Sequence, residues 1–153
     1  MLKISQKGWW TLWLAYALFL LAATQYPFRY HFNADYFRLR TEHIQSFPKI
    51  IIGNHTVSRR NLADYPVNLA LFFPFGFFGY RAISDRFSNS GRGRPSTGSG
   101  TVRLFLLLVL VAFIFSTGIE FLQLFTETRF ATVSDVIDNT TGAFVGVLFA
   151  AFI

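Results

Sequence analysis

The stretch VRLFLLLVLVAFIFSTGIEFLQLF, residues 102–125, is almost continuously apolar and is long enough to cross a lipid bilayer as one helix. It carries a single acidic side chain, Glu120, close to its end. A carboxylate among lipid chains is costly unless it is paired, protonated or turned toward a polar cavity. The rise of an α-helix places Glu120 about 7 to 8 Å below the nearer membrane interface. This stretch therefore predicts a membrane helix with a functional carboxylate near one end.

The composition of the whole chain is that of an integral membrane protein. Of its 153 residues, 52% are hydrophobic, 20 are Phe and only 14% are charged. The length supports a single domain over residues 1–153. The absence of cysteine excludes disulfides, thiolate nucleophiles and Cys-ligated metals. The formal charge of +6 fits anionic headgroups better than nucleic acid, so we predict membrane lipids, and no nucleic acid, as partners.

Apolar runs at four places predict the fold. The first run begins with Trp9, Trp10 and Trp13, which are typical of a membrane interface. A cleaved signal peptide is the alternative for this run, but its length and its tryptophans favour a retained span. We expect an all-α integral membrane bundle of four transmembrane helices, over about residues 9–26, 64–83, 102–125 and 134–153. In the second span, Pro66 fits a first helical turn and Pro74 predicts a kink.

The connection between the first two spans is predicted to be one long extracytoplasmic loop, residues 27–65. Its short run KIIIGN, residues 49–54, fits a small strand or hairpin. The three histidines of the chain lie twelve residues apart, at His31, His43 and His55. This spacing matches no metal-ligand pattern, so we predict neither a metal site nor a cofactor.

Basic residues predict the orientation of the chain. Lys3 and Lys7 precede the first span, and five arginines lie between residues 81 and 103. Lys and Arg are enriched in cytoplasmic segments of membrane proteins. We therefore expect the N-terminus and the Ser88–Gly100 loop in the cytoplasm, with the long loop on the outer side.

Polar residues are expected to meet on that outer side, because four crossings place the end of the third span beside the starts of the second and fourth. One polar stripe, on the third helix, consists of Ser116, Glu120, Gln123 and Glu127. A second stripe, on the fourth helix, consists of Asp135, Asp138 or Asn139, Gly142 and Gly146. We expect the two stripes to face each other, since glycines allow neighbouring helices to approach closely.

A purely structural role is the alternative for each charged residue. Ser134 fits the N-cap of the fourth helix and Asp135 complements its dipole, so we assign Asp135 to structure. Arg129 can neutralise Glu120. For Glu120, Arg129 and Asp138 we favour function, because ionisable groups at membrane depth are candidates for functional sites. We expect Glu120 and Asp138 to approach each other, with Arg129 reaching at least one of them.

Three separated segments, taken in order, resemble a known family. They are DYPVNLALFFPFGF at residues 64–77, STGIEFLQ at 116–123 and DVIDNTTGA at 135–143, with Arg129 between the last two. They are similar to the VanZ family over about residues 64–148. The resemblance implies a small multi-pass protein of the bacterial inner (cytoplasmic) membrane. The family is named for an accessory of glycopeptide resistance that lowers susceptibility to teicoplanin, and no catalytic role comes with its motif residues.

The resemblance and the helical spacing together give the candidate site residues. Those assigned to ligand binding are Glu120, Gln123, Arg129, Asp138, Asn139 and Asn68. Those assigned to structure are Pro74, Gly76, Gly142 and Gly146.

Three functions stay open at this point. The first is recognition of a polar lipid headgroup or cell-envelope ligand, such as a lipid-linked precursor, in a vestibule at the outer face, with Arg129 as the anion contact. The second is an intramembrane acid/base enzyme acting on a lipid-linked substrate, although the chain offers no convincing nucleophile. The third is a small proton-coupled transporter, for which four helices form a thin pathway unless the protein is a homo-oligomer.

Overall fold

The computed structural model describes residues 4–41, 59–89, 99–128 and 131–153. Within these ranges the fold is all-helical and contains no strand, which confirms the predicted class. Its helices are α1 (Gln6–Gln25), α2 (Ala34–Thr41), α3 (Arg59–Asn89), α4 (Ser99–Gln123) and α5 (Val133–Phe152). The strand or hairpin predicted over residues 49–54 lies outside the described residues, as do His43 and His55.

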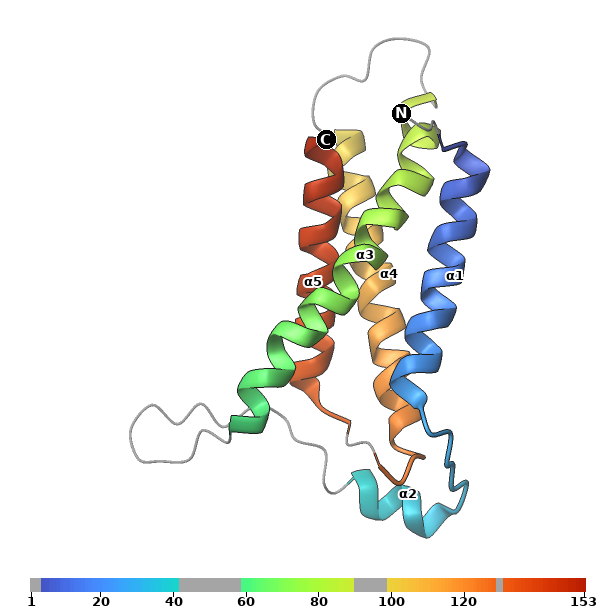
Figure 1. Ribbon diagram of the computed structural model, residues 1–153, viewed down its shortest axis with the longest axis vertical. Coiled ribbons are helices and arrows are strands. Elements are labelled where there is room, and N and C mark those ends of the chain that lie inside the picture. The colour runs from blue at the N-terminus through green and yellow to red at the C-terminus, as the bar shows by residue number, and fades with distance from the viewer. Residues whose placement is uncertain (1–3, 42–58, 90–98, 129–130) are drawn as a thin grey trace.

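The four long helices run lengthwise through the bundle, and the short α2 lies across one end of it (Figure 1). At that end α1 and α4 finish and α3 and α5 begin, and we call it the α2 end. The start of α1 and the end of α5 are both at the opposite end. This alternation brings the last turn of α4 beside the first turn of α5.

The helix α1 has one face toward the bundle and one away from it. Its first turn is capped by Ser5, whose Oγ accepts a hydrogen bond from the Gly8 N–H at 3.2 Å. Trp13 is buried against the other helices, whereas Leu14 and Leu18 are exposed. The predicted first span is thus a helix whose outer face is apolar.

The helix α3 is longer than its predicted span of residues 64–83. It has 31 residues, from Arg59 to Asn89. Both Pro66 and Pro74 lie inside it, so the placement of Pro66 in the first helical turn was wrong. The added turns are mostly polar, and an apolar pattern could not reveal them.

The helices α3 and α5 cross in direct backbone contact. Three glycines lie where an added Cβ would collide with the backbone of the opposite helix: Gly76 against Ala143, Gly142 against Leu69, and Gly146 against Phe73. Only glycine permits so close an approach. The glycines of α5 therefore face α3, and the expectation that they would draw the third and fourth spans together was wrong.

The hydrophobic core lies around α3, which contacts α1, α4 and α5. Its large buried members include Phe72, Phe75, Leu108, Ile119 and Val147. Phe75 stacks on the ring of Phe115 in α4, with centroids 5.1 Å apart. The core thus fixes α3 as the central helix.

The helix α5 begins at Val133, and its N-cap is Thr132. The Thr132 Oγ1 accepts a hydrogen bond from the Asp135 N–H at 3.1 Å. The prediction of Ser134 as the cap was therefore wrong. The Ser134 hydroxyl instead lies 3.1 Å from the Thr132 hydroxyl.

Among the described residues, two helices are long and apolar enough to span a membrane. They are Gly100–Gln123, with a mean hydropathy of 2.5, and Val133–Phe152, with a mean hydropathy of 1.2. The tryptophans of α1 and the polar ends of α3 lower the hydropathy of those helices. A bundle of four crossings stays a prediction.

Candidate functional site

Buried polar side chains gather at the α2 end, where α4 finishes and α5 begins. We call one group of them the polar cluster: Ser116, Glu120 and Gln123 of α4, Asp135, Asp138 and Asn139 of α5, and Asn68 of α3. Asn68 and Asp135 are half-buried, and the other members are buried. The cluster therefore has a partly accessible rim between α3 and α5 and a buried floor between α4 and α5.

The deepest contact of the floor joins Asn139 to Ser116. The Asn139 Nδ2 donates a hydrogen bond to the Ser116 Oγ at 2.9 Å. Ser116 is fully buried and Asn139 is 4% exposed. The Asn139 Oδ1, in contrast, has no hydrogen-bond partner within the described part of the chain. A buried acceptor without a partner is costly, so a further donor would be stabilised at this atom.

Glu120 is buried, at 7% exposure, and binds the connection that leads into α5. Its Oε2 accepts a hydrogen bond from the Thr132 backbone N–H at 2.8 Å. Thr132 is also the N-cap of α5, so Glu120 stabilises the residue that starts the next helix. Sequence patterns of side chains do not reveal this partner, because it is a backbone group.

The rim is held by one contact between α3 and α5. The Asn68 Nδ2 donates a hydrogen bond to the Asp135 Oδ1 at 2.9 Å. Asp138 follows one turn later on α5 and is buried. Asp135 thus has the structural role expected of it, together with a contact to the candidate residue Asn68.

Glu127 does not belong to the polar stripe predicted for the third helix. The helix α4 ends at Gln123, so the predicted continuation of the stripe to Glu127 was wrong. The Glu127 Oε1 lies 2.5 Å from the His31 Nε2, and both side chains are largely exposed. This pair lies outside the buried floor.

Two predictions about the charged residues stay predictions. Arg129 lies outside the described residues, so its predicted contact with Glu120 or Asp138 stays a prediction. Glu120 and Asp138 both belong to the polar cluster, on adjoining helices. Their direct approach to each other is still an expectation.

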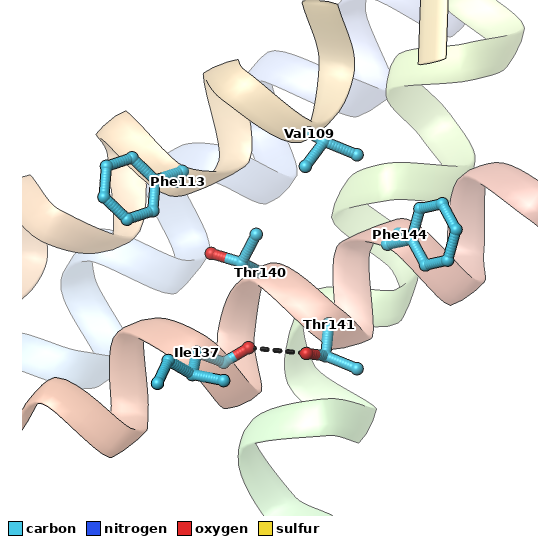
Figure 2. Close-up of a pocket in the computed structure, with 6 residues that line it drawn as sticks. All are labelled: Val109, Phe113, Ile137, Thr140, Thr141 and Phe144. Atoms are coloured by element: carbon cyan, nitrogen blue, oxygen red, sulfur yellow. Dashed lines mark hydrogen bonds between the residues drawn. The ribbon is translucent and has the colours of Figure 1, made fainter. Parts of the chain in front are cut away.

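An apolar groove lies between α4 and α5, apart from the polar cluster. Its volume is about 290 Å³, and it is lined by Val109, Phe113, Ile137, Thr140, Thr141 and Phe144. Figure 2 shows the Thr141 hydroxyl turned back to its own helix, where it donates to the Ile137 carbonyl at 2.7 Å. Thr140 likewise donates to the Val136 carbonyl at 2.7 Å. Because both hydroxyls are satisfied within α5, this groove offers mainly apolar contact.

A family model described as VanZ/LLP1 matches residues 13–153, nearly the whole chain. The chain belongs to the VanZ/LLP1 family. The family match thus confirms the resemblance and extends it to α1 and α2, ahead of the motifs at residues 64–148 that carried it. Comparison with curated proteins and with solved structures gave no match. Membership of the VanZ/LLP1 family and the two apolar helices together indicate a membrane protein.

The sequence did not predict the residues that hold α2 in this VanZ/LLP1 protein. The Tyr36 hydroxyl and the Arg40 Nη2 both donate to the Thr126 carbonyl, each at 2.8 Å. Arg40 is buried and lies just beyond the end of α4, where a cation complements the helix dipole. The sequence did contain a signal for the start of α2, because Asn33 followed by Asp35 is typical of a helix N-terminus. In the structure the Asn33 Oδ1 accepts a hydrogen bond from the Asp35 N–H at 2.9 Å.

A second unpredicted residue, Gln25, links α1 to α4 at the same end. Its Nε2 donates to the Ile119 carbonyl at 3.3 Å, and its Oε1 accepts from the Tyr30 hydroxyl at 3.4 Å. Gln25 is buried although it is the last residue of α1. Within the described residues, no group of three or more His, Asp or Glu side chains is arranged to hold a metal ion.

Proposed function

We propose that this VanZ/LLP1 protein crosses the membrane four times, through α1, α3, α4 and α5. All four helices turn apolar side chains outward, with Leu18, Val67, Ile114 and Phe149 exposed. Such surfaces are unfavourable in water and favourable against lipid chains. The tryptophans that lower the hydropathy of α1 are residues that membrane interfaces favour.

We further propose that the membrane is the bacterial inner membrane, with the N-terminus in the cytoplasm and the α2 end outside. The densities of Lys and Arg near the first span and between residues 81 and 103 support this orientation. Reporter fusions after Gly98 and Ile153 test it. A green fluorescent protein is expected to fluoresce at both positions and alkaline phosphatase to be inactive. Strong phosphatase activity at either position contradicts the orientation.

We propose that the polar cluster binds a polar lipid headgroup or a lipid-linked precursor of the cell envelope. The observation that carries this proposal is the buried Asn139 Oδ1, which has no hydrogen-bond partner within the described residues. Its neighbours in the cluster, Glu120, Asp138 and Asp135, are also acceptors when ionised. The cluster therefore favours a ligand with hydroxyl or amine donors, with Arg129 available for an anionic group.

Binding explains the geometry better than chemistry at the same site. Ser116 is fully buried, and its hydroxyl accepts a hydrogen bond from the Asn139 amide. Glu120 already accepts a backbone hydrogen bond from Thr132. Groups committed to hold the fold in this way are poorly suited to attack a substrate or move its protons.

Native mass spectrometry of the purified protein tests the ligand. The wild type is expected to carry a lipid or lipid-linked adduct. Asp138→Asn is expected to lower the abundance of this adduct, because the substitution replaces one buried acceptor oxygen by an amide donor. Glu127→Gln is the matched control, because Glu127 is an exposed carboxylate at the same end. Equal adducts in all three proteins would rule out the polar cluster as the binding site. Turnover of the adduct, or uptake driven by a pH gradient, would instead support an enzyme or a transporter.

We also propose, from family membership, that the protein affects glycopeptide susceptibility through this ligand. Expression of the chain in a susceptible host is expected to lower susceptibility to teicoplanin, and expression of Asp138→Asn to do so less. Unchanged susceptibility with the wild-type chain in the membrane would remove this part of the proposal while leaving the binding site untouched.

A further inference from the structure

The segment around α2 exposes an unusual amount of large apolar surface. Phe32 is 79% exposed and Leu39 is 57% exposed, and Tyr26 and Phe28 are also exposed. Contiguous apolar surface on a folded protein marks contact with a membrane or another protein. This segment is therefore expected to contact a membrane or another protein.

The inner side of α2 is fixed to the end of α4. Tyr36 and Arg40 donate to the Thr126 carbonyl, and the Phe37 ring stacks on Phe125 with centroids 5.2 Å apart. The residues of the connection add to this, since the Phe32 ring lies 5.4 Å from that of Phe125. These contacts hold α2 in one place, so its exposed side chains have a defined direction.

The position of α2 places these side chains at the level of a membrane interface. Figure 1 shows α2 lying across the bundle just past the ends of α1 and α4. Phe121, in the last turn of α4, is exposed close by and its ring contacts those of Phe37 and Phe125. The Phe125 ring contacts those of Phe32 and Phe121, so the exposed aromatic side chains of residues 26–33 adjoin the apolar outer surface of α4.

Charged side chains accompany the apolar ones. Arg29, Arg38 and Asp35 are exposed on the same segment. Arg29 lies beside the aromatic side chains of residues 26–33, and aromatic and basic side chains are both favoured in the headgroup layer of a bilayer. A protein partner would not require the surface to join the lipid-facing side of α4.

We propose that residues 26–33, the connection between α1 and α2, form an interfacial segment in the leaflet at the α2 end. Phe28 and Phe32 enter the boundary between headgroups and acyl chains, and Arg29 contacts lipid phosphates. This lipid surface is separate from the polar cluster, and it rests on the proposed crossing of α4. It would hold the α2 end at a fixed depth.

The absence of cysteine from the chain allows a direct test. Single variants Phe28→Cys and Phe32→Cys are labelled with a nitroxide and reconstituted into vesicles of phosphatidylcholine and phosphatidylglycerol at three to one. Paramagnetic relaxation then compares access of oxygen, which concentrates in lipid, with access of a water-soluble nickel chelate. Asp35→Cys is the matched exposed control on α2, and Leu110→Cys, exposed on α4, reports the proposed crossing itself.

Labels at positions 28 and 32 are expected to favour oxygen over the nickel chelate, and the label at position 35 the reverse. Higher nickel access at positions 28 and 32, with oxygen-favouring access at position 110, would overturn the interfacial segment while leaving the crossing of α4 intact. Spin coupling between labels at position 32 would overturn it in favour of a second copy.

Discussion

The helix α5 is held by two neighbours in two different ways. Against α3 it uses bare backbone at Gly76, Gly142 and Gly146, which leave no room for a side chain, and one polar contact at the α2 end, from Asn68 to Asp135. Against α4 it uses polar side chains near the α2 end and leaves an apolar groove farther along. The contact at the glycines is structural, whereas the contact with α4 leaves the buried Asn139 Oδ1 without a hydrogen-bond partner among the described residues. The difference indicates that α3 and α5 form the frame, and that the face between α4 and α5 is available for a ligand.

The largest expected effect comes from the frame. Gly142→Ala places a methyl group against the Leu69 backbone, which cannot move aside as a flexible side chain would. We expect a loss of about 3 kcal/mol in stability, the upper part of the usual range for overpacking. The thermal midpoint in detergent, read from the monodisperse fraction, measures it. Gly118→Ala is the matched control, because no other atoms lie within 4 Å of the added methyl group. Equal midpoints for the two variants would contradict the assignment of α3 and α5 as the frame.

The next effect tests the carboxylate at the end of α4. Glu120→Ala removes the acceptor of the half-buried Thr132 N–H and should cost about 2 kcal/mol. Glu127→Ala breaks only the exposed pair with His31, for which about 0.5 kcal/mol is typical. At matched membrane abundance, Glu120→Ala is also expected to lose more function, measured as the adduct in native mass spectra. If both variants lose the same amount of adduct, the depth of Glu120 in the membrane does not explain its importance.

These outcomes also show which parts of the molecule its sequence could reveal. Apolar runs located α1, α4 and α5 within a few residues, because burial and lipid contact both select apolar side chains. They missed the ends of α3, which are polar, and they missed α2, which lies in a polar connection. The sequence also did not reveal how each helix is rotated about its axis. The glycines of α5 were therefore predicted to face α4, whereas they face α3.

The candidate site was predicted more fully as a set of residues than as a set of contacts. The spacing of Ser116, Glu120 and Gln123 correctly placed three polar side chains on one buried face of α4. The partners of these side chains did not follow from spacing. Glu120 binds the backbone of Thr132, and Asn68 binds Asp135 across α3 and α5. Both contacts depend on the paths of distant segments.

A smaller effect separates structure from function between α4 and α5. Ser116→Ala leaves the Asn139 amide buried without its acceptor and should lower stability by about 1 to 2 kcal/mol. The double variant Ser116→Ala with Asn139→Leu replaces both partners by apolar groups, so its stability should recover toward the wild type. Thermal midpoints in detergent compare the two. A double variant that is less stable than Ser116→Ala would mean that the pair is needed for folding.

The smallest effect is expected in the apolar groove. Thr140→Val keeps the shape of the side chain and removes a hydroxyl that is bonded only to its own helix. We expect a change below about 0.5 kcal/mol, which is usual for substitutions away from special features. A midpoint shift as large as that of Ser116→Ala would show that the hydroxyl has another partner, and that the groove is not a mainly apolar surface.

The most direct test of the binding claim joins these last two variants in one measurement. Native mass spectra are recorded for the wild type, for Thr140→Val and for the double variant Ser116→Ala with Asn139→Leu, at equal concentration in the same detergent. The account predicts the same lipid or lipid-linked adduct on the wild type and on Thr140→Val, and its loss from the double variant. An adduct of unchanged mass and abundance on the double variant would contradict the claim that the polar cluster holds the ligand.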